Sequence, residues 1–177
     1  MLAKHPELVS GFMGFNTTAP LAKLDFAALK HSWAYWYQWV LMNKRLGPKM
    51  LVSEDRRFLN WVMKWVGGGF VLSDDELDIY VDRFKDPARA KAGSQWYRTF
   101  QLREARPWIK GEYADPVDVP LRWVLGLNDP VITRTTLLPL RGLSEDEAFE
   151  EVPGVGHWII EQAPELVLDR LRQLMKL

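Results

Sequence analysis

Three short segments are predicted to form β-strands, the first two of them apolar, and a long helical stretch separates the first segment from the other two. The segments cover residues 8–15, 121–127 and 149–152. Strands that alternate with helices are typical of a parallel sheet whose strands are joined by helical crossovers. The sequence therefore predicts an α/β fold in which an all-helical segment is inserted between the first and second strands.

The inserted segment covers residues 21–106, and we expect it to form a cap, or lid, over a core made from residues 1–20 and 107–177. Aromatic and apolar residues recur within it at the three- and four-residue spacing of a helix face. The chain is therefore predicted to have two parts, a partial sheet core and a helical cap.

Capping residues predict where several helices begin and end. Ser73 and Glu76 can each satisfy the other's backbone N–H in a capping box, and Asp86 precedes a proline at the first helical position. Two glycine-containing segments are predicted to end helices: Gly47-Pro48 ends a helix over 33–41, and Gly67-Gly68-Gly69 ends a helix over 58–66. Pro164 is predicted to lie in the first turn of a closing helix.

Composition and charge exclude several classes of protein. Lys and Arg number 23, as do Asp and Glu, so the net charge is zero and a basic nucleic-acid-binding face is not expected. The chain has no Cys, which excludes disulfides and thiolate chemistry. No apolar run reaches the roughly 18–20 residues of a membrane span, and the N-terminus lacks the apolar region of a signal peptide. We therefore expect a cytoplasmic protein without membrane contact.

Asp129 and His157 each follow a predicted strand. In open parallel sheets, ligands bind beyond the carboxyl ends of the strands, where both side chains would lie. Each residue alone is explained as an ordinary turn or surface residue. The pair, in the order acid then histidine, matches two members of a catalytic triad. We expect Asp129 to fix the tautomer of His157 and His157 to act as a general base.

The sequence lacks a nucleophile for this pair. Triad order places the nucleophile before the acid, in a Gly-x-Ser-x-Gly or Gly-x-Asp-x-Gly turn, and neither pattern occurs. The nearest match, around Ser144, lies after Asp129 and lacks the second glycine. Ser144 and Glu147 are predicted to form a capping box instead.

The helical segment is rich in aromatic residues, with seven of the nine Trp between Trp33 and Trp108. Aromatics at helical spacing usually form core. However, the first predicted helix is aromatic on more than one face, which indicates a covered cavity or a partner surface. A phenol can donate a hydrogen bond to an oxygen that develops negative charge. Tyr97 and Tyr35 are the candidates for this role, and the candidates for lining the cavity are Tyr37, Trp33, Trp36, Trp96 and Trp158.

Metal and cofactor motifs are absent from the sequence. His5 and His31 have no His or carboxylate at ligand spacing, and no metalloprotease, dinucleotide or calcium-loop motif occurs. The triglycine run is not followed by the Lys and Ser or Thr of a phosphate-binding loop. We therefore expect no metal and no cofactor.

Together these features resemble the C-terminal part of an α/β-hydrolase, and within that superfamily an epoxide hydrolase. Residues 119–130 resemble the strand and turn that deliver the acid, and Gly156-His157-Trp158 resembles the loop that delivers the histidine. Trp96-Tyr97-Arg98 resembles the cap motif that supplies one of two tyrosines gripping the epoxide oxygen. The resemblance covers nearly the whole chain and implies a partial α/β-hydrolase fold with a helical cap.

The resemblance implies hydrolysis of an apolar epoxide to a diol through an alkyl-enzyme ester. In this scheme Asp129 orients His157, His157 activates water against the ester, Tyr97 polarises the epoxide oxygen, and Tyr35 substitutes for the second tyrosine. The family's His-Gly-x-Pro loop and nucleophile turn have no counterpart here. The resemblance therefore also implies a truncated chain that is inactive alone.

Two other functions remain open. One is a non-catalytic module that binds an apolar ligand among the aromatic residues, and the other is ester or haloalkane hydrolysis on the same fold. The expected partners are a small apolar substrate and either an N-terminal hydrolase half or a second copy of the chain. Either macromolecule would cover the open edge of a three-stranded sheet.

Overall fold

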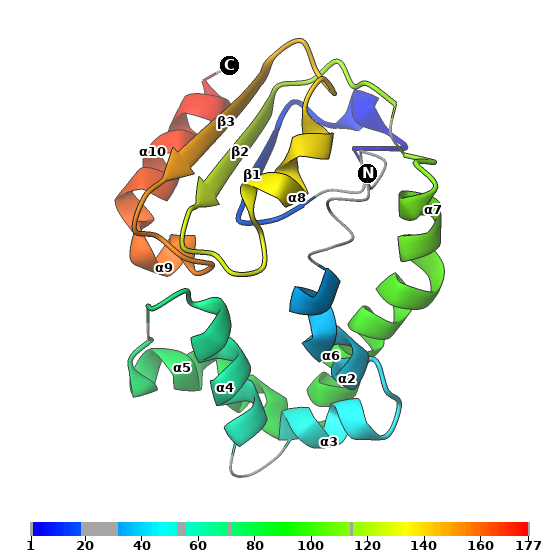
Figure 1. The fold of residues 1–177 in the computed structure, drawn as a ribbon, viewed down its shortest axis with the longest axis vertical. Helices are drawn as coiled ribbons and strands as arrows, with labels where there is room; N and C mark the ends of the chain where they lie inside the picture. Colours follow the sequence, from blue (N-terminus) through cyan, green and yellow to red (C-terminus); the bar gives the residue numbers. More distant parts are fainter. Residues whose placement is uncertain (1, 19–31, 53–55, 71, 114, 177) are drawn as a thin grey trace.

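The computed structural model describes residues 2–18, 32–52, 56–70, 72–113 and 115–176. Within these ranges, a three-stranded sheet with its flanking helices lies on one side, and a group of helices from the middle of the chain lies on the other (Figure 1). This arrangement confirms the predicted insertion of helices between the first and second strands. The first residues of the predicted cap, 21–31, lie outside the described ranges, and the proposed domain boundaries stay a prediction.

The sheet consists of β1 (Phe12–Phe15), β2 (Leu121–Gly126) and β3 (Glu147–Val152), in that spatial order. Both pairings are parallel, and Leu121 of β2 is in register with Phe12 on one side and Glu147 on the other. Because β2 and β3 are parallel neighbours, the strand ends that precede Asp129 and His157 lie at the same end of the sheet. Among the described residues, the outer edge of β1 has no partner strand.

Short helices occupy the rest of the described chain. Before β1 lies η1 (Pro6–Leu8). Between β1 and β2 lie η2 (Ser32–Tyr35), α2 (Trp36–Leu41), α3 (Leu46–Val52), α4 (Arg57–Val66), α5 (Asp74–Val81), η3 (Asp82–Lys85), α6 (Pro87–Thr99), the π-helical η4 (Phe100–Glu104) and α7 (Ala105–Ile109). Between β2 and β3 lie α8 (Arg134–Leu137) and η5 (Leu138–Leu140), and α9 (Ile159–Gln162) and α10 (Pro164–Met175) follow. No helix within the described ranges is long and apolar enough to cross a membrane.

The predicted capping residues begin and end helices as expected. Glu76 N donates to Ser73 Oγ at 3.3 Å, and Ser73 N donates to the Glu76 carboxylate at 2.8 Å, which completes the capping box of α5. Asp86 accepts from Ala88 N at 2.8 Å at the start of α6. Helix α4 ends at Val66, directly before the triglycine run. Local hydrogen bonds therefore determine these boundaries.

Three predicted boundaries are wrong. Gly47-Pro48 does not end a helix: it lies in the first turn of α3, where a missing N–H is tolerated, and Asn43 Oδ1 caps this turn by accepting from Leu46 N. Residues 8–15 do not form one strand, because Pro6 begins a 3-10 turn and pairing with β2 starts at Phe12.

The third error concerns Ser144 and Glu147, which do not form a capping box. Ser144 Oγ donates to Val119 O at 2.8 Å, and the Glu147 carboxylate accepts from Gly142 N at 2.8 Å. Glu147 instead begins β3, two residues earlier than predicted, because its backbone pairs with Leu121 of β2.

One hydrophobic core joins the sheet to the helical segment. Trp123, at the centre of β2, is 1% exposed, and its ring packs against those of Phe12 and Phe149. Val62 and Val66 of α4 belong to the same buried cluster. A second cluster lies within the helical segment and includes Leu41, Leu51, Leu59, Leu77, Val81 and Ala90. Helix α4 therefore attaches the helical segment to the sheet.

Candidate active site

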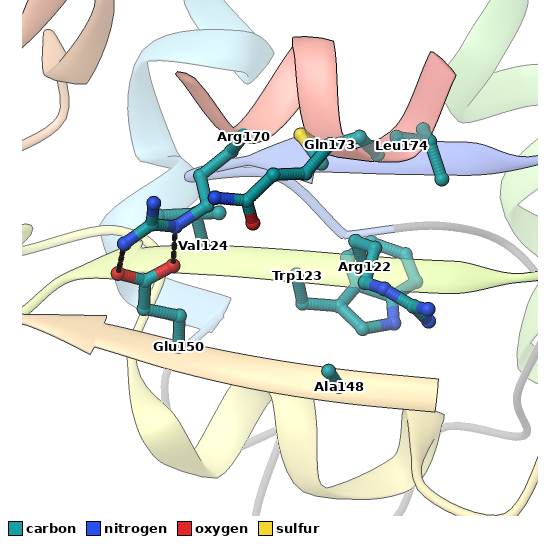
Figure 2. Close-up of a pocket in the computed structure, with 9 residues that line it drawn as sticks. Arg122, Trp123, Val124, Ala148, Glu150, Arg170, Gln173 and Leu174 are labelled. Carbon is teal, nitrogen blue, oxygen red and sulfur yellow. Dashed lines mark hydrogen bonds and ion pairs between the residues drawn. The ribbon is translucent and has the colours of Figure 1, made fainter. Parts of the chain in front are cut away.

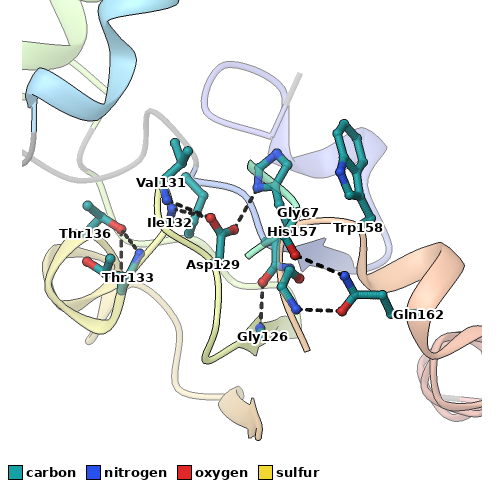
Figure 3. Close-up of polar contacts among 12 residues, drawn as sticks. Gly67, Gly126, Asp129, Val131, Ile132, Thr133, Thr136, His157, Trp158 and Gln162 are labelled. Atoms are coloured by element: carbon teal, nitrogen blue, oxygen red, sulfur yellow. Dashed lines mark hydrogen bonds and ion pairs between the residues drawn. The ribbon is translucent and has the colours of Figure 1, made fainter. Parts of the chain in front are cut away.

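Asp129 and His157 are in direct contact at the carboxyl end of the sheet. Asp129 lies in the loop after β2, and His157 lies in the loop after β3. The Nδ1 atom of His157 is 2.7 Å from Asp129 Oδ2 (Figure 3). The structure therefore brings together the two residues for which the sequence predicts an acid–histidine pair.

The loop backbone holds the Asp129 carboxylate in place. Its side chain is fully buried, and Oδ1 accepts hydrogen bonds from Val131 N at 2.7 Å and Ile132 N at 3.0 Å. An ionised carboxylate can only accept hydrogen bonds, so the contact with His157 requires a proton on Nδ1. Nε2 then carries the lone pair. Because the His157 side chain is 25% exposed, this nitrogen can reach a substrate or a water molecule.

Asn16, which no sequence motif singles out, ties the ends of the strands together. It directly follows β1, and its buried side chain accepts from Gly126 N at 2.6 Å and donates to Gly156 O. Its φ is +42°, a left-handed conformation that Asn adopts more readily than most residues. The one signal in the sequence is its place: it follows the first strand as Asp129 follows the second.

Two phenols from separate helices meet within the helical segment. The rings of Tyr37 in α2 and Tyr97 in α6 lie 6.1 Å apart and nearly perpendicular. Burial raises the pKa of both phenols above their ordinary value, and for Tyr37 the Asp129 charge adds to the effect. Both phenols therefore remain protonated hydrogen-bond donors at neutral pH.

Tyr35, the predicted second donor, lies in η2 and packs against the sheet core. Burial, with smaller contributions from Tyr37 and Asp129, raises its pKa to about 12. The Asp129 charge therefore acts on Tyr35 as well as on Tyr37. The ring beside Tyr97, however, is that of Tyr37, which we expected to line the pocket.

The predicted pocket tryptophans separate into two environments. Trp96 is 77% exposed and Trp33 is also exposed, whereas Trp36 and Trp158 are half-buried. The Trp158 indole N–H donates to Met63 O of α4 at 2.9 Å. Trp158 therefore joins the loop that carries His157 to the helical segment.

Four indole rings form a continuous aromatic face across η2, α2 and α4, here defined as Trp33, Trp36, Trp61 and Trp65. Trp61 and Trp65 stack with an interplanar angle of 4°, Trp36 contacts Trp61, and Trp33 contacts Trp65. Trp65 also contacts Tyr37. The aromatic face thus continues to the phenols. Neither Trp61 nor Trp65 is among the residues that the sequence predicts to line a cavity.

One cavity of the structure is lined by a member of the acid–histidine pair, and a second cavity is not. One, of about 410 Å³, is lined by Asp129 and by residues 125–127 and 132–135. The other, of about 250 Å³, lies between α10 and the sheet, away from the loops of Asp129 and His157 (Figure 2). Its charged groups are paired, Arg170 with Glu150 at 2.6 Å and Arg122 with Asp146 at 2.7 Å. The acid–histidine pair therefore lies at the carboxyl ends of β2 and β3 and not in this second cavity.

Metal binding has no support among the described residues, where no group of three or more His, Asp or Glu side chains is arranged to hold an ion.

Solved structures share this fold at low sequence identity. The chain superposes on Cfl2 from Burkholderia cenocepacia with a TM-score of 0.73 and 20% identity, over 97% of this chain and 59% of that one. For the epoxide hydrolase CorEH the TM-score is 0.76 at 17% identity, over 99% and 62%. For a loop variant of haloalkane dehalogenase DbeA-M1 from Bradyrhizobium elkanii it is 0.70 at 16% identity, over 96% and 60%.

These likenesses show the fold. The parallel sheet with helices inserted after its first strand is part of an α/β-hydrolase fold, as the sequence predicts. The chain spans about three fifths of the length of these structures. No family model matches the sequence, and no curated protein matches it.

Proposed function

We propose that this chain supplies the acid–histidine pair and the cap of an α/β-hydrolase that converts apolar epoxides to diols. The observation that carries the proposal is the 2.7 Å contact between His157 Nδ1 and the buried Asp129 carboxylate. This contact leaves the lone pair on Nε2, which can act as a base. The epoxide hydrolase CorEH and a haloalkane dehalogenase share the fold, which supports a hydrolytic reaction.

The reaction has two steps, and this chain acts in both. A carboxylate nucleophile attacks an epoxide carbon, the ring C–O bond breaks, and Tyr97 or Tyr37 donates a proton to the leaving oxygen. His157 Nε2 then takes a proton from water, and the resulting hydroxide attacks the carbonyl of the ester. The diol is released, the carboxylate is restored, and the proton taken up by His157 returns through water to the tyrosinate left by the first step. Asp129 stabilises the imidazolium that forms in the second step.

The nucleophile is proposed to come from a polypeptide segment outside these 177 residues. Two observations support this. The sequence has no nucleophile turn, and the outer edge of β1 has no partner strand among the described residues. A strand paired with β1 would place its own carboxyl end beside Asn16, Asp129 and His157. We therefore propose an N-terminal hydrolase half as the partner, with a second copy of this chain as the competing occupant of the edge.

The proposal is tested with a hybrid enzyme, in which this chain is joined to the N-terminal half of an epoxide hydrolase. We expect the hybrid to hydrolyse styrene oxide, and Tyr97→Phe to slow that reaction about 10²–10³-fold because a donor to the leaving oxygen is lost. Hydrolysis of an activated ester, which needs no such donor, should stay unchanged. Tyr113→Phe, outside the helical segment, is the matched control. Styrene oxide turnover that is unchanged by Tyr97→Phe would favour ester hydrolysis as the native reaction.

Binding of an apolar ligand without catalysis is the second candidate, and the aromatic face supports it. Trp61 is 51% exposed although it stacks on Trp65, so this face can accept a further flat ring. We expect Trp61→Leu to weaken binding of naphthalene about tenfold, measured by calorimetry on the 177-residue chain.

Trp39→Leu is the control for this experiment, because Trp39 is 62% exposed but lines a different cavity with Lys44 and Arg98. Equal weakening by both variants would show non-specific adsorption to exposed indoles. Tight binding by the chain that survives Asp129→Asn and His157→Ala, together with a hybrid that fails to turn over, would favour the binding module.

A further inference from the structure

The triglycine turn, Gly67-Gly68-Gly69, follows α4 and lies against both loops of the acid–histidine pair. A Cβ on Gly68 would lie 2.0 Å from Asn128 O, in the residue before Asp129. A Cβ on Gly156, in the residue before His157, would lie 2.1 Å from Gly67 O. Neither contact leaves room for a side chain. The backbone of the helical segment therefore touches the residue preceding each member of the pair.

Gln162 connects the same turn to the peptide before His157. Its Oε1 accepts from Gly156 N at 2.6 Å, and its Nε2 donates to Gly67 O at 3.3 Å (Figure 3). The opposite side of Gly156 is held by Asn16, which donates to Gly156 O. Two side-chain amides, one after β1 and one in α9, therefore fix the backbone that leads into His157.

Two further hydrogen bonds connect the residues next to Asp129 and His157. Asn128 N donates to Val155 O at 2.8 Å, which links the acid loop to the histidine loop. Trp158, the residue after His157, donates its indole N–H to Met63 O in α4. Trp158 is thus bonded to the last turn of α4, and Gly156 is linked through Gln162 to the turn that follows it.

We propose that the triglycine turn and Gln162 are positioning elements that hold His157 against Asp129. The reason is geometric, since a displacement of about 1 Å in a reacting group can cost about 100-fold in rate. Displacing Gly68 from Asn128 shifts the loop that carries Asp129, and removing Gln162 releases the peptide before His157, so either change moves one member of the pair relative to the other. The catalytic meaning of this placement rests on the proposed function, but the placement itself is measurable without turnover.

The test uses the 177-residue chain labelled with 15N in its three histidines, His5, His31 and His157. Ring 15N shifts report which nitrogen of a neutral imidazole carries the proton, and His157→Ala assigns the signal. We expect the wild-type His157 to be the Nδ1–H tautomer. Gly68→Ala and Gln162→Ala are expected to convert most of the population to the Nε2–H tautomer, because the hydrogen bond to Asp129 is lost.

Two control variants are expected to leave the His157 tautomer unchanged. Gly69 also has a positive φ, +96° against +61° for Gly68, but a Cβ there meets nothing within 4 Å. Gly69→Ala therefore imposes backbone strain at least as large, without the clash. Gln101→Ala removes a carboxamide hydrogen bond, 2.6 Å from Gln38, inside the helical segment. If Gly68→Ala fails to fold, Gln162→Ala alone decides the result.

Asp129→Asn separates this proposal from the proposed function. If Asp129→Asn changes the His157 tautomer but Gly68→Ala and Gln162→Ala do not, the positioning role is overturned and the pair stands. If Gly69→Ala acts as strongly as Gly68→Ala, strain rather than contact is responsible, and the positioning role is again overturned. If Asp129→Asn changes nothing, the pair itself does not form, and both proposals fail.

Discussion

Asp129→Asn is expected to lower styrene oxide turnover by the hybrid enzyme about 10³–10⁴-fold while leaving the fold intact. The two N–H groups of Val131 and Ile132 require an acceptor at the Oδ1 position, so the amide oxygen stays there. The amide NH₂ then replaces Oδ2 and faces His157 Nδ1 as a donor. Nδ1 must become the acceptor, which moves the ring proton to Nε2, and Nε2 can no longer act as a base.

The matched control for this prediction is Asp146→Asn, which removes one carboxylate charge far from the pair. Asp146 pairs with Arg122 at 2.7 Å and is exposed. We expect turnover of this variant to equal that of the unaltered hybrid. Asp129→Asn activity within tenfold of the unaltered hybrid, with correct folding shown by near-ultraviolet circular dichroism, would contradict a catalytic role for the pair.

The acid–histidine pair could be predicted because it depends on two regular features of parallel sheets. Strands run in one direction, so their carboxyl ends share an edge, and ligand-binding residues gather there. Asp129 and His157 each follow a strand, and the contact between them spans only 28 positions in the sequence. The capping residues Ser73 and Asp86 could be predicted for a similar reason, since their hydrogen bonds reach no further than the next turn.

Asn16 and Gln162 could not be predicted from local pattern. Asn16 bonds to groups 110 and 140 positions away, and Gln162 reaches a carbonyl 95 positions away. Their roles depend on which peptide groups become buried when the strands assemble. The error at Ser144 and Glu147 has the same origin, because pairing with β2 outweighs a local Ser-x-x-Glu pattern.

Which tyrosine ring lies beside Tyr97 depends on how the first helix begins. Residues 32–35 form a 3-10 turn, and the α-helix starts only at Trp36. A 3-10 turn has about 3.0 residues per turn, so side-chain directions over this segment differ from those expected at 3.6. The irregular start of the helix therefore places Tyr37, rather than Tyr35, beside Tyr97.

Trp123→Ala is expected to have the largest effect on stability, lowering the free energy of unfolding by about 3–5 kcal/mol. The indole fills the space between Phe12 and Phe149 on the neighbouring strands, with ring centroids 5.0 and 6.3 Å away. It also packs directly on the backbone of Gly14, where a Cβ would lie 2.7 Å from the ring. Removing it opens a cavity that touches all three strands. Urea unfolding followed by circular dichroism measures the change.

Trp123→Phe distinguishes loss of packing from loss of a polar contact. The Trp123 indole nitrogen is buried without a hydrogen-bond partner among the described residues, so the N–H contributes no bond that Phe would lose. Phe keeps most of the apolar volume, and we expect its cost to stay below about 1.5 kcal/mol. Trp96→Ala, at a ring that is 77% exposed, should change stability by no more than about 0.5 kcal/mol. Equal effects of Trp123→Ala and Trp96→Ala would contradict a sheet core centred on Trp123, and with it the placement of Asp129 at the end of a buried central strand.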